Sequence, residues 1–255
     1  MNAEDRKSAA ARALPLVDLT NLNADCSHDD IDALCKRAQT PFGNVGAICI
    51  WPRFVGHAHK LLAGTGIPIA TVVNFPGGTA SAEMTALETR TALDDGANEI
   101  DLVMPYRDFA NGDVESVRSM IAAIRVETGG KALLKVIIET GELANDKLVR
   151  TASDLAIGEG ADFIKTSTGK VPVNATPDVA EIMIQAIHDN NKPVGFKPAG
   201  GVKTTEDTAT FLAIADRIMG PDWATPKTFR FGASGVLDDL LAALQGGEAS
   251  TSDGY

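Results

Sequence analysis

The chain of 255 residues is 44% hydrophobic, which is enough for one large α/β domain with a full core. Its net charge of −11 argues against nucleic acid or an anionic membrane as a partner, so an anionic small substrate would need a local basic pocket. The sequence has no C-x-x-C pair, no secretory signal in Met1–Ala13 and no apolar run long enough for a membrane span, so we expect a cytoplasmic protein with reduced cysteines.

Short apolar stretches alternate with helical patterns along the chain. Predicted strands cover Leu16–Leu19, Val45–Ile50, Ile69–Asn74, Glu99–Val103, Leu133–Ile138, Phe163–Lys165, Val194–Lys197 and Phe229–Ala233. Predicted helices cover Asp29–Ala38, Arg53–Ala63, Ala80–Asp95, Val114–Thr128, Asp146–Glu159, Pro177–Asn190, Thr205–Met219 and Val236–Leu244. Eight strand–helix units of this size are typical of a TIM (β/α)8 barrel, and nearly all-apolar strands fit a parallel sheet covered on both faces.

The domain organisation follows from the absence of a linker or low-complexity tract before the end of the chain. We expect a single barrel domain over residues 1–245, followed by a small, polar tail over residues 246–255 that ends in Tyr255. Asn145-Asp146 and Thr176-Pro177 are typical helix starts, and Asn190-Asn191 is a typical helix end. A doubly wound sheet is the alternative architecture, because strand order cannot be read from one sequence.

Polar residues gather where the predicted strands end. In a barrel, the carboxyl ends of the strands surround the active site. The residues at these ends are Asp18, Cys49, Asn74, Asp101, Glu139, Lys165, Lys197 and Ser234.

Two lysines at the ends of apolar strands indicate the chemistry. Lysine is rarely buried because its ammonium loses hydration, and burial next to a second positive charge favours the neutral amine. A neutral lysine amine is a nucleophile that forms Schiff bases with carbonyls. Lys165 is the candidate nucleophile and Lys197 its neighbouring charge. The alternatives are that Lys165 extends its head to solvent and that Lys197 forms a salt bridge with a carboxylate such as Asp101.

Asp101 and Asp18 are the candidate carboxylates of this site. A carboxylate on an inward-facing strand position is costly unless it is paired with a cation or transfers protons. Asp101 suits proton relay during Schiff-base formation, and the alternative is an ion pair that holds the lysines in place. Asp18 could orient a lysine or a substrate hydroxyl, or close the barrel bottom.

Two glycine-rich turns follow the last two predicted strands and resemble a phosphate cradle. Glycines let backbone N–H groups approach an anion, and barrel enzymes commonly bind phosphate at these two loops. The local positive charge would come from Lys170 and Lys203. The turns consist of Gly200, Gly201, Val202 and Lys203, and of Gly232, Ala233, Ser234 and Gly235.

Other motifs are weaker. Cys49 is most simply a small core residue. The four histidines lack the spacing of a metal site, and neither glycine turn matches a dinucleotide fingerprint. The sequence thus gives no indication of a metal or cofactor.

Several segments of the chain resemble the deoxyribose-phosphate aldolases of the enterobacterial type. The resemblance implies a TIM-barrel, homodimeric, metal-free class I aldolase that needs no cofactor and reversibly cleaves 2-deoxy-D-ribose 5-phosphate into acetaldehyde and D-glyceraldehyde 3-phosphate. The segments that carry it are Val17–Asn23, Ala47–Phe54, Val136–Leu143, Gly160–Lys170 and Gly195–Val202.

The resemblance also implies roles for single residues. Lys165 would form the Schiff base, Lys197 would favour its neutral form, and Asp101 would relay protons with Asp18 in the same network. Tyr255 would enter the site from the tail and assist proton transfer. Thr168, Gly169, Lys170, Gly201, Gly232 and Ser234 would contact the sugar or its phosphate, and Cys49 would lie at the pocket.

The chain departs from its relatives at two positions. They carry serine where this chain has Gly235, and often arginine where it has Lys203. One hydroxyl contact to phosphate is lost, so we expect a weaker preference for phosphorylated aldehydes.

Without the resemblance, two other functions fit the same barrel. A phosphosugar isomerase or epimerase would use an aspartate or glutamate base and no Schiff base. A sugar-phosphate-binding barrel would bind without turnover.

Overall fold

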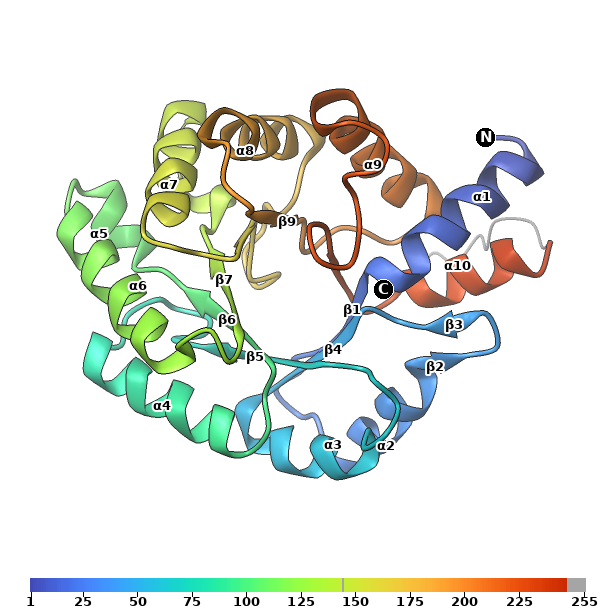
Figure 1. The fold of residues 1–255 in the computed structure, drawn as a ribbon, viewed down its shortest axis with the longest axis horizontal. Coiled ribbons are helices and arrows are strands. Elements are labelled where there is room, and N and C mark those ends of the chain that lie inside the picture. The colour runs from blue at the N-terminus through green and yellow to red at the C-terminus, as the bar shows by residue number, and fades with distance from the viewer. Residues whose placement is uncertain (144, 247–255) are drawn as a thin grey trace.

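The computed structural model describes residues 1–143 and 145–246, in which eight parallel strands form one sheet in the order β10-β1-β4-β5-β6-β7-β8-β9 (Figure 1). The strands are β1 (Val17–Asn21), β4 (Ala47–Ile50), β5 (Ile69–Val73), β6 (Glu99–Val103), β7 (Leu133–Ile137), β8 (Phe163–Lys165), β9 (Gly195–Lys197) and β10 (Phe231–Ala233). Neighbours in the sheet are thus consecutive along the chain, apart from β10, which pairs with β1.

The sheet closes between β9 and the segment that leads into β10. Parallel bridges join Phe196 to Phe229 and Ala199 to Gly232. The N–H of Arg230 donates to the carbonyl of Phe196 at 3.0 Å, and the N–H of Gly232 donates to the carbonyl of Pro198 at 2.9 Å. The predicted single TIM barrel is therefore confirmed, and the doubly wound alternative is wrong.

Helices form a ring around the strands (Figure 1). Their predicted starts are confirmed where the sequence carries a cap: the side chain of Asn145 accepts the N–H of Leu148, and that of Thr176 accepts the N–H of Val179. The helices are α1 (Ala3–Ala13), α2 (His28–Arg37), α3 (Val55–Leu61), α4 (Ala82–Asp94), α5 (Tyr106–Ala110), α6 (Val114–Thr128), α7 (Asp146–Gly158), α8 (Pro177–Asn190), α9 (Thr205–Met219) and α10 (Val236–Leu244), with 3-10 turns at Leu14–Leu16, Pro52–Phe54 and Thr140–Glu142.

Three elements were not predicted from the sequence. The first is α1, which buries only Arg6, Ala10 and Ala13 and so carries little hydrophobic periodicity. It packs against α9 and α10 (Figure 1). The others are the short helix α5 and the hairpin of β2 (Gln39–Thr40) and β3 (Gly43–Asn44), which are too short for a periodic pattern.

The first predicted strand is shifted, because Leu16 ends a 3-10 turn and β1 continues to Asn21. No helix among the described residues is long and apolar enough to cross a membrane.

Candidate active site

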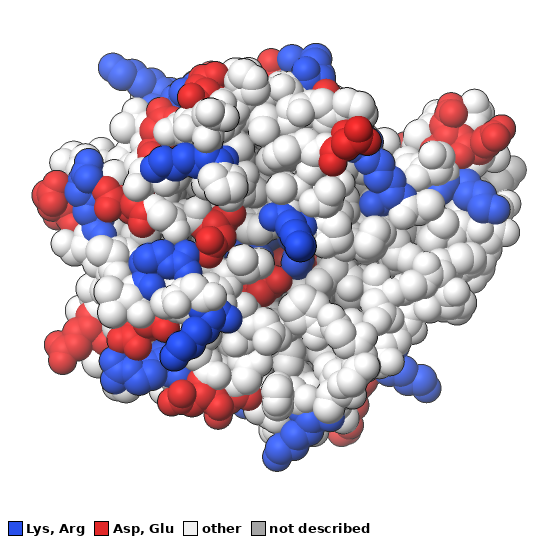
Figure 2. Space-filling view, viewed as in Figure 1, with Lys and Arg blue, Asp and Glu red and all other residues white. Residues whose placement is uncertain are grey.

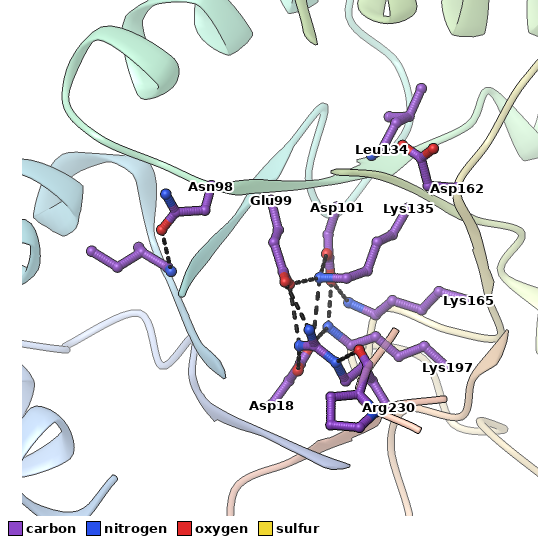
Figure 3. Close-up of polar contacts among 12 residues, drawn as sticks. Asp18, Asn98, Glu99, Asp101, Leu134, Lys135, Asp162, Lys165, Lys197 and Arg230 are labelled. Atoms are coloured by element: carbon purple, nitrogen blue, oxygen red, sulfur yellow. Dashed lines mark hydrogen bonds and ion pairs between the residues drawn. The ribbon is translucent and has the colours of Figure 1, made fainter. Parts of the chain in front are cut away.

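Lys165 and Lys197 point into the barrel beside each other. Lys165 pairs with Ile137 of β7 on one side and with Lys197 of β9 on the other. Directly paired residues of parallel neighbours project to the same face of a sheet, so both ammonium groups reach the barrel interior (Figure 3). Lys165 is 3% exposed and Lys197 is fully buried.

Asp101 of β6 joins these lysines to a third one. Its Oδ2 accepts hydrogen bonds from Lys165 Nζ at 2.7 Å and from Lys197 Nζ at 2.8 Å. Its Oδ1 accepts a hydrogen bond from Lys135 Nζ of β7 at 3.1 Å. The carboxylate is fully buried, so these cations provide the pairing that its burial requires.

Lys197 also pairs with Asp18 of β1, because Lys197 Nζ donates a hydrogen bond to Asp18 Oδ2 at 2.5 Å. The Asp18 Oδ1 accepts from Arg230, which also donates to Glu99 at 2.9 Å, and Glu99 accepts a hydrogen bond from Lys135. Asp18 therefore orients Lys197, as one of its predicted roles requires. We call the seven residues Asp18, Glu99, Asp101, Lys135, Lys165, Lys197 and Arg230 the interior charge cluster (Figure 3).

The cluster holds the carboxylates of Asp18 and Asp101 ionised. Burial alone would raise the pKa of Asp101, but the charges of Lys135, Lys165 and Lys197 outweigh it and keep this pKa well below its usual range. Burial alone would lower the pKa of Lys197, but Asp101 and Asp18 outweigh it and raise this pKa. Lys197 is thus a fixed positive charge beside Lys165.

A cavity of about 580 Å³ opens above Lys165. Basic and acidic side chains gather around a hollow near the centre of the molecule (Figure 2). The cavity wall contains Lys165 but none of the other six cluster residues. It consists of Thr20, Leu22, Asn23, Lys165, Thr168, Gly169, Lys170, Asn174, Ala199, Gly200, Gly201, Val202, Lys203, Thr204, Gly232, Ala233, Ser234 and Gly235.

The two predicted glycine turns lie side by side in the wall of this cavity, where the N–H of Gly200 donates to the Gly232 carbonyl at 3.4 Å. Gly200 and Gly201 have φ angles of 78° and 86°, which favour glycine. A Cβ on Gly232 would lie 2.8 Å from the Ala199 Cβ and 3.2 Å from the Lys197 Cε, so only glycine allows this close approach. Lys170 lines the same wall and donates from Nζ to the Leu22 carbonyl at 2.8 Å.

Cys49 does not line the cavity, so its predicted place at the pocket needs correction. It is 1% exposed and packs in a small apolar cluster with Leu22, Ala70 and Val72, against Trp51 and Phe75. Burial raises the pKa of its thiol. The interpretation of Cys49 as a small core residue therefore describes it better.

Comparisons with known proteins identify the family. Residues 12–236 match the DeoC/LacD family aldolases. The chain belongs to this aldolase family. It is 56% identical over 257 residues to the deoxyribose-phosphate aldolase of Agrobacterium fabrum, with 100% of this chain and 99% of the relative covered.

Solved structures share the aldolase's fold. A candidate deoxyribose-phosphate aldolase from Toxoplasma gondii superposes with a TM-score of 0.88 at 24% identity, over 97% of this chain and 100% of the other. A candidate deoxyribose-phosphate aldolase from Coccidioides immitis has a TM-score of 0.80 at 25% identity, over 93% of this chain and 97% of the other.

Sequence reasoning missed three members of the aldolase's charge cluster, Lys135, Glu99 and Arg230. Lys135 carries the same signal as the other two lysines, since it lies within the apolar run Leu133–Ile137. Glu99 precedes Asp101 by two residues, the spacing at which side chains of a strand share a face. Arg230 carries the signal of the lysines too, since it lies between Phe229 and Phe231 in the last predicted strand, although in the structure it directly precedes β10.

Tyr255 lies outside the described residues, so its predicted place in the site stays a prediction. Within the described part of the aldolase, no three His, Cys, Asp or Glu side chains lie close enough together to hold a metal ion.

Proposed function

We propose that this aldolase reversibly cleaves 2-deoxy-D-ribose 5-phosphate into acetaldehyde and D-glyceraldehyde 3-phosphate through a Schiff base on Lys165. One observation carries the proposal: of the three buried lysines Lys135, Lys165 and Lys197, Lys165 lines the cavity. The substrate named for the Agrobacterium fabrum relative supports the choice of sugar.

Ion pairing also distinguishes Lys165 from the other two lysines. Lys197 pairs with two carboxylates, Asp18 and Asp101, and Lys135 also contacts more than one carboxylate. Lys165 pairs with Asp101, and that carboxylate is shared by all three lysines. Lys165 is therefore the least extensively ion-paired of the three lysines.

Charge balance in the cluster points the same way. The cluster has three carboxylates, and with Lys165 protonated it has four cations. The other six cluster residues carry three charges of each sign, so they balance one another without a charge on Lys165.

The reaction begins when the Lys165 amine attacks C1 of the open-chain sugar, and loss of water gives an iminium. The C3 hydroxyl loses its proton, the C2–C3 bond breaks, and its electron pair moves into the iminium to give an enamine. D-glyceraldehyde 3-phosphate leaves as the aldehyde formed at C3. Protonation of the enamine at C2 and hydrolysis then release acetaldehyde and the free lysine.

Asp101 and Lys197 serve the proton transfers of this scheme. The ionised Asp101 carboxylate lies 2.7 Å from Lys165 Nζ, which suits it to accept the proton of the C3 hydroxyl through a bound water molecule and to return it later. Lys197 places a fixed positive charge beside the nucleophile, as its predicted role requires. Tyr255 keeps its proposed role in protonation of the enamine carbon.

The glycine turns receive the phosphate group. Backbone N–H groups at Gly201 and Gly235 and the side chains of Lys203 and Ser234 are suited to an anion, and α10 begins at the residue after Gly235. Thr168, Gly169 and Lys170 contact the sugar. The homodimer, the cytoplasmic location and the domain boundary at residue 245 stay predictions.

An assay of 2-deoxy-D-ribose 5-phosphate cleavage tests the proposal directly. The released aldehydes are measured by their reduction with coupled dehydrogenases. Reductive trapping with acetaldehyde and borohydride, read out by peptide mass spectrometry, is expected to place a two-carbon adduct on Lys165. An adduct on Lys197 would exchange the roles of the two lysines. Conversion of the sugar phosphate without an adduct and without release of acetaldehyde would favour the isomerase or epimerase. Binding without turnover would favour the sugar-phosphate-binding barrel.

Gly235→Ser is expected to raise the preference for phosphorylated over plain aldehyde by roughly three- to tenfold in kcat/KM, the effect of one added hydrogen bond. A Cβ on Gly235 meets no atom within 4 Å, so the added side chain fits without rearrangement. Gly235→Ala is the matched control, because it adds the Cβ without the hydroxyl. If the ratio of kcat/KM for phosphorylated and plain aldehyde is the same in Gly235→Ser, Gly235→Ala and the unchanged protein, position 235 does not contribute to phosphate recognition.

A further inference from the structure

Glu139 is a buried carboxyl that the proposed mechanism does not use. It follows β7, and the N–H of its neighbour Ile138 donates to the Lys165 carbonyl at 2.9 Å, so Glu139 lies beside the carboxyl end of β8. It is 0% exposed. Its φ of 57° and ψ of 57° fall in the left-handed region, which a residue with a Cβ adopts at a cost. The fold therefore keeps a glutamate here in an unfavourable backbone conformation.

The carboxyl of Glu139 anchors one wall of the cavity. Its Oε1 accepts the N–H of Thr168 at 3.1 Å, while its Oε2 is buried without a hydrogen-bond partner among the described residues. The Thr168 Oγ1 accepts the N–H of Lys170 at 3.0 Å, and Lys170 Nζ donates to the Leu22 carbonyl at 2.8 Å. Thr168, Lys170 and Leu22 all line the cavity, so this chain of contacts runs from the end of β7 along its wall.

The hydrogen bond of the Glu139 side chain is separate from the backbone contacts that hold the loops after β7 and β8 together. The N–H of Thr140 donates to the Thr166 carbonyl at 3.0 Å. Gly141 packs so closely on the next loop that a Cβ there would lie 2.0 Å from the Val173 carbonyl oxygen. Neither contact uses the Glu139 side chain, so we expect the loops to keep their path when that side chain is shortened.

We propose that Glu139 is a positioning residue that holds Thr168 to Lys170 against the substrate through the Thr168 amide. The proposal rests on the proposed function, because that function places the sugar against Thr168, Gly169 and Lys170.

Glutamine is a close mimic of this carboxyl. Burial raises the pKa of Glu139, against the opposing effect of its hydrogen bond with Thr168. A carboxyl that is easily kept neutral resembles an amide in charge, and glutamine also has the same length and the same acceptor oxygen. Glu139→Gln therefore keeps the contact, and Glu139→Ala removes it.

Steady-state kinetics of these two variants tests the proposal. For Glu139→Ala we expect KM for 2-deoxy-D-ribose 5-phosphate to rise about tenfold while kcat changes less than about threefold, because the lost contact serves binding. For Glu139→Gln we expect KM within about twofold of the unchanged protein. A merely structural role would lower the melting temperature and leave KM of the folded enzyme unchanged.

Hydrogen exchange at the Thr168 amide gives a readout that does not depend on turnover. Exchange is expected to accelerate in Glu139→Ala and to stay slow in Glu139→Gln, because only the alanine variant exposes this N–H. An unchanged KM in Glu139→Ala, or a glutamine variant as impaired as the alanine variant, would overturn the proposal. If Glu139→Ala does not fold, Glu139→Asp, which is one methylene shorter, replaces it with the same expectations.

The proposed function and the positioning role of Glu139 can be contradicted independently of each other. Absence of cleavage by the unchanged protein would remove the proposed function. The exchange rates of Thr168 in the two variants would then decide whether Glu139 positions this wall.

Discussion

Lys165→Met is expected to lower kcat/KM for 2-deoxy-D-ribose 5-phosphate by about 10⁴-fold or more, because removal of a covalent nucleophile removes the reaction path itself. The same variant is expected to fold with a free energy of unfolding within about 1 kcal/mol of the unchanged protein. The reason is that Asp101 keeps two lysine partners, and the cluster is left with three charges of each sign. Activity and stability should therefore separate at this position.

Kinetic assays and denaturant unfolding measure both quantities. Lys165→Arg should be equally inactive, since a guanidinium stays protonated and forms no Schiff base. Lys60→Met, at an exposed position on α3, is the control for replacing a lysine and should leave activity unchanged. Activity in Lys165→Met within tenfold of the unchanged protein would contradict the Schiff-base mechanism at this lysine.

The architecture could be predicted because each strand is a short apolar run bounded by cap or turn residues. The strands and helices of the barrel lie close to their predicted ranges, with Asn145 and Thr176 at the predicted helix starts. The helix α1 could not be found this way, because three buried positions in eleven residues do not produce a periodic signal. Burial of this helix comes from tertiary contacts with α9 and α10.

The site was predicted in part because a charged residue in an apolar strand is a strong local signal. Lys165, Lys197, Asp101 and Asp18 were found, and the structure brings them within hydrogen-bond distance. The partners that complete the cluster depend on register between strands, which one sequence does not contain. Arg230 reaches Glu99 across 131 positions of the chain.

The cluster also explains how an acidic protein can carry a basic reaction centre. The net charge of −11 lies on the whole chain, whereas the cavity wall itself carries Lys165, Lys170 and Lys203. Buried carboxylates beneath Lys165 keep Lys135 and Lys197 charged without needing water. The cavity can therefore attract a phosphate although the protein as a whole is acidic.

Lys197→Met is expected to differ from Lys165→Met, because it should lower both the stability and the activity of the protein. Asp18 loses the lysine that donates to it at 2.5 Å, and Asp101 loses one of its three lysine partners. The free energy of unfolding should therefore fall by about 3–5 kcal/mol, as for other broken buried ion pairs. We expect kcat/KM at pH 7 to fall by about 10²-fold or more. Borohydride trapping on Lys165 should persist at high pH, because the nucleophile is still present.

The double variant Asp18→Asn/Lys197→Met gives the sharpest test of charge pairing. It removes one carboxylate together with one cation, and Glu99 and Asp101 keep their pairing with Lys135 and Arg230. Part of the stability that Lys197→Met loses should therefore return in the double variant, as measured by denaturant unfolding. Equal losses of stability in the single and double variants would show that Lys197 does not stabilise the fold through its pairing with Asp18.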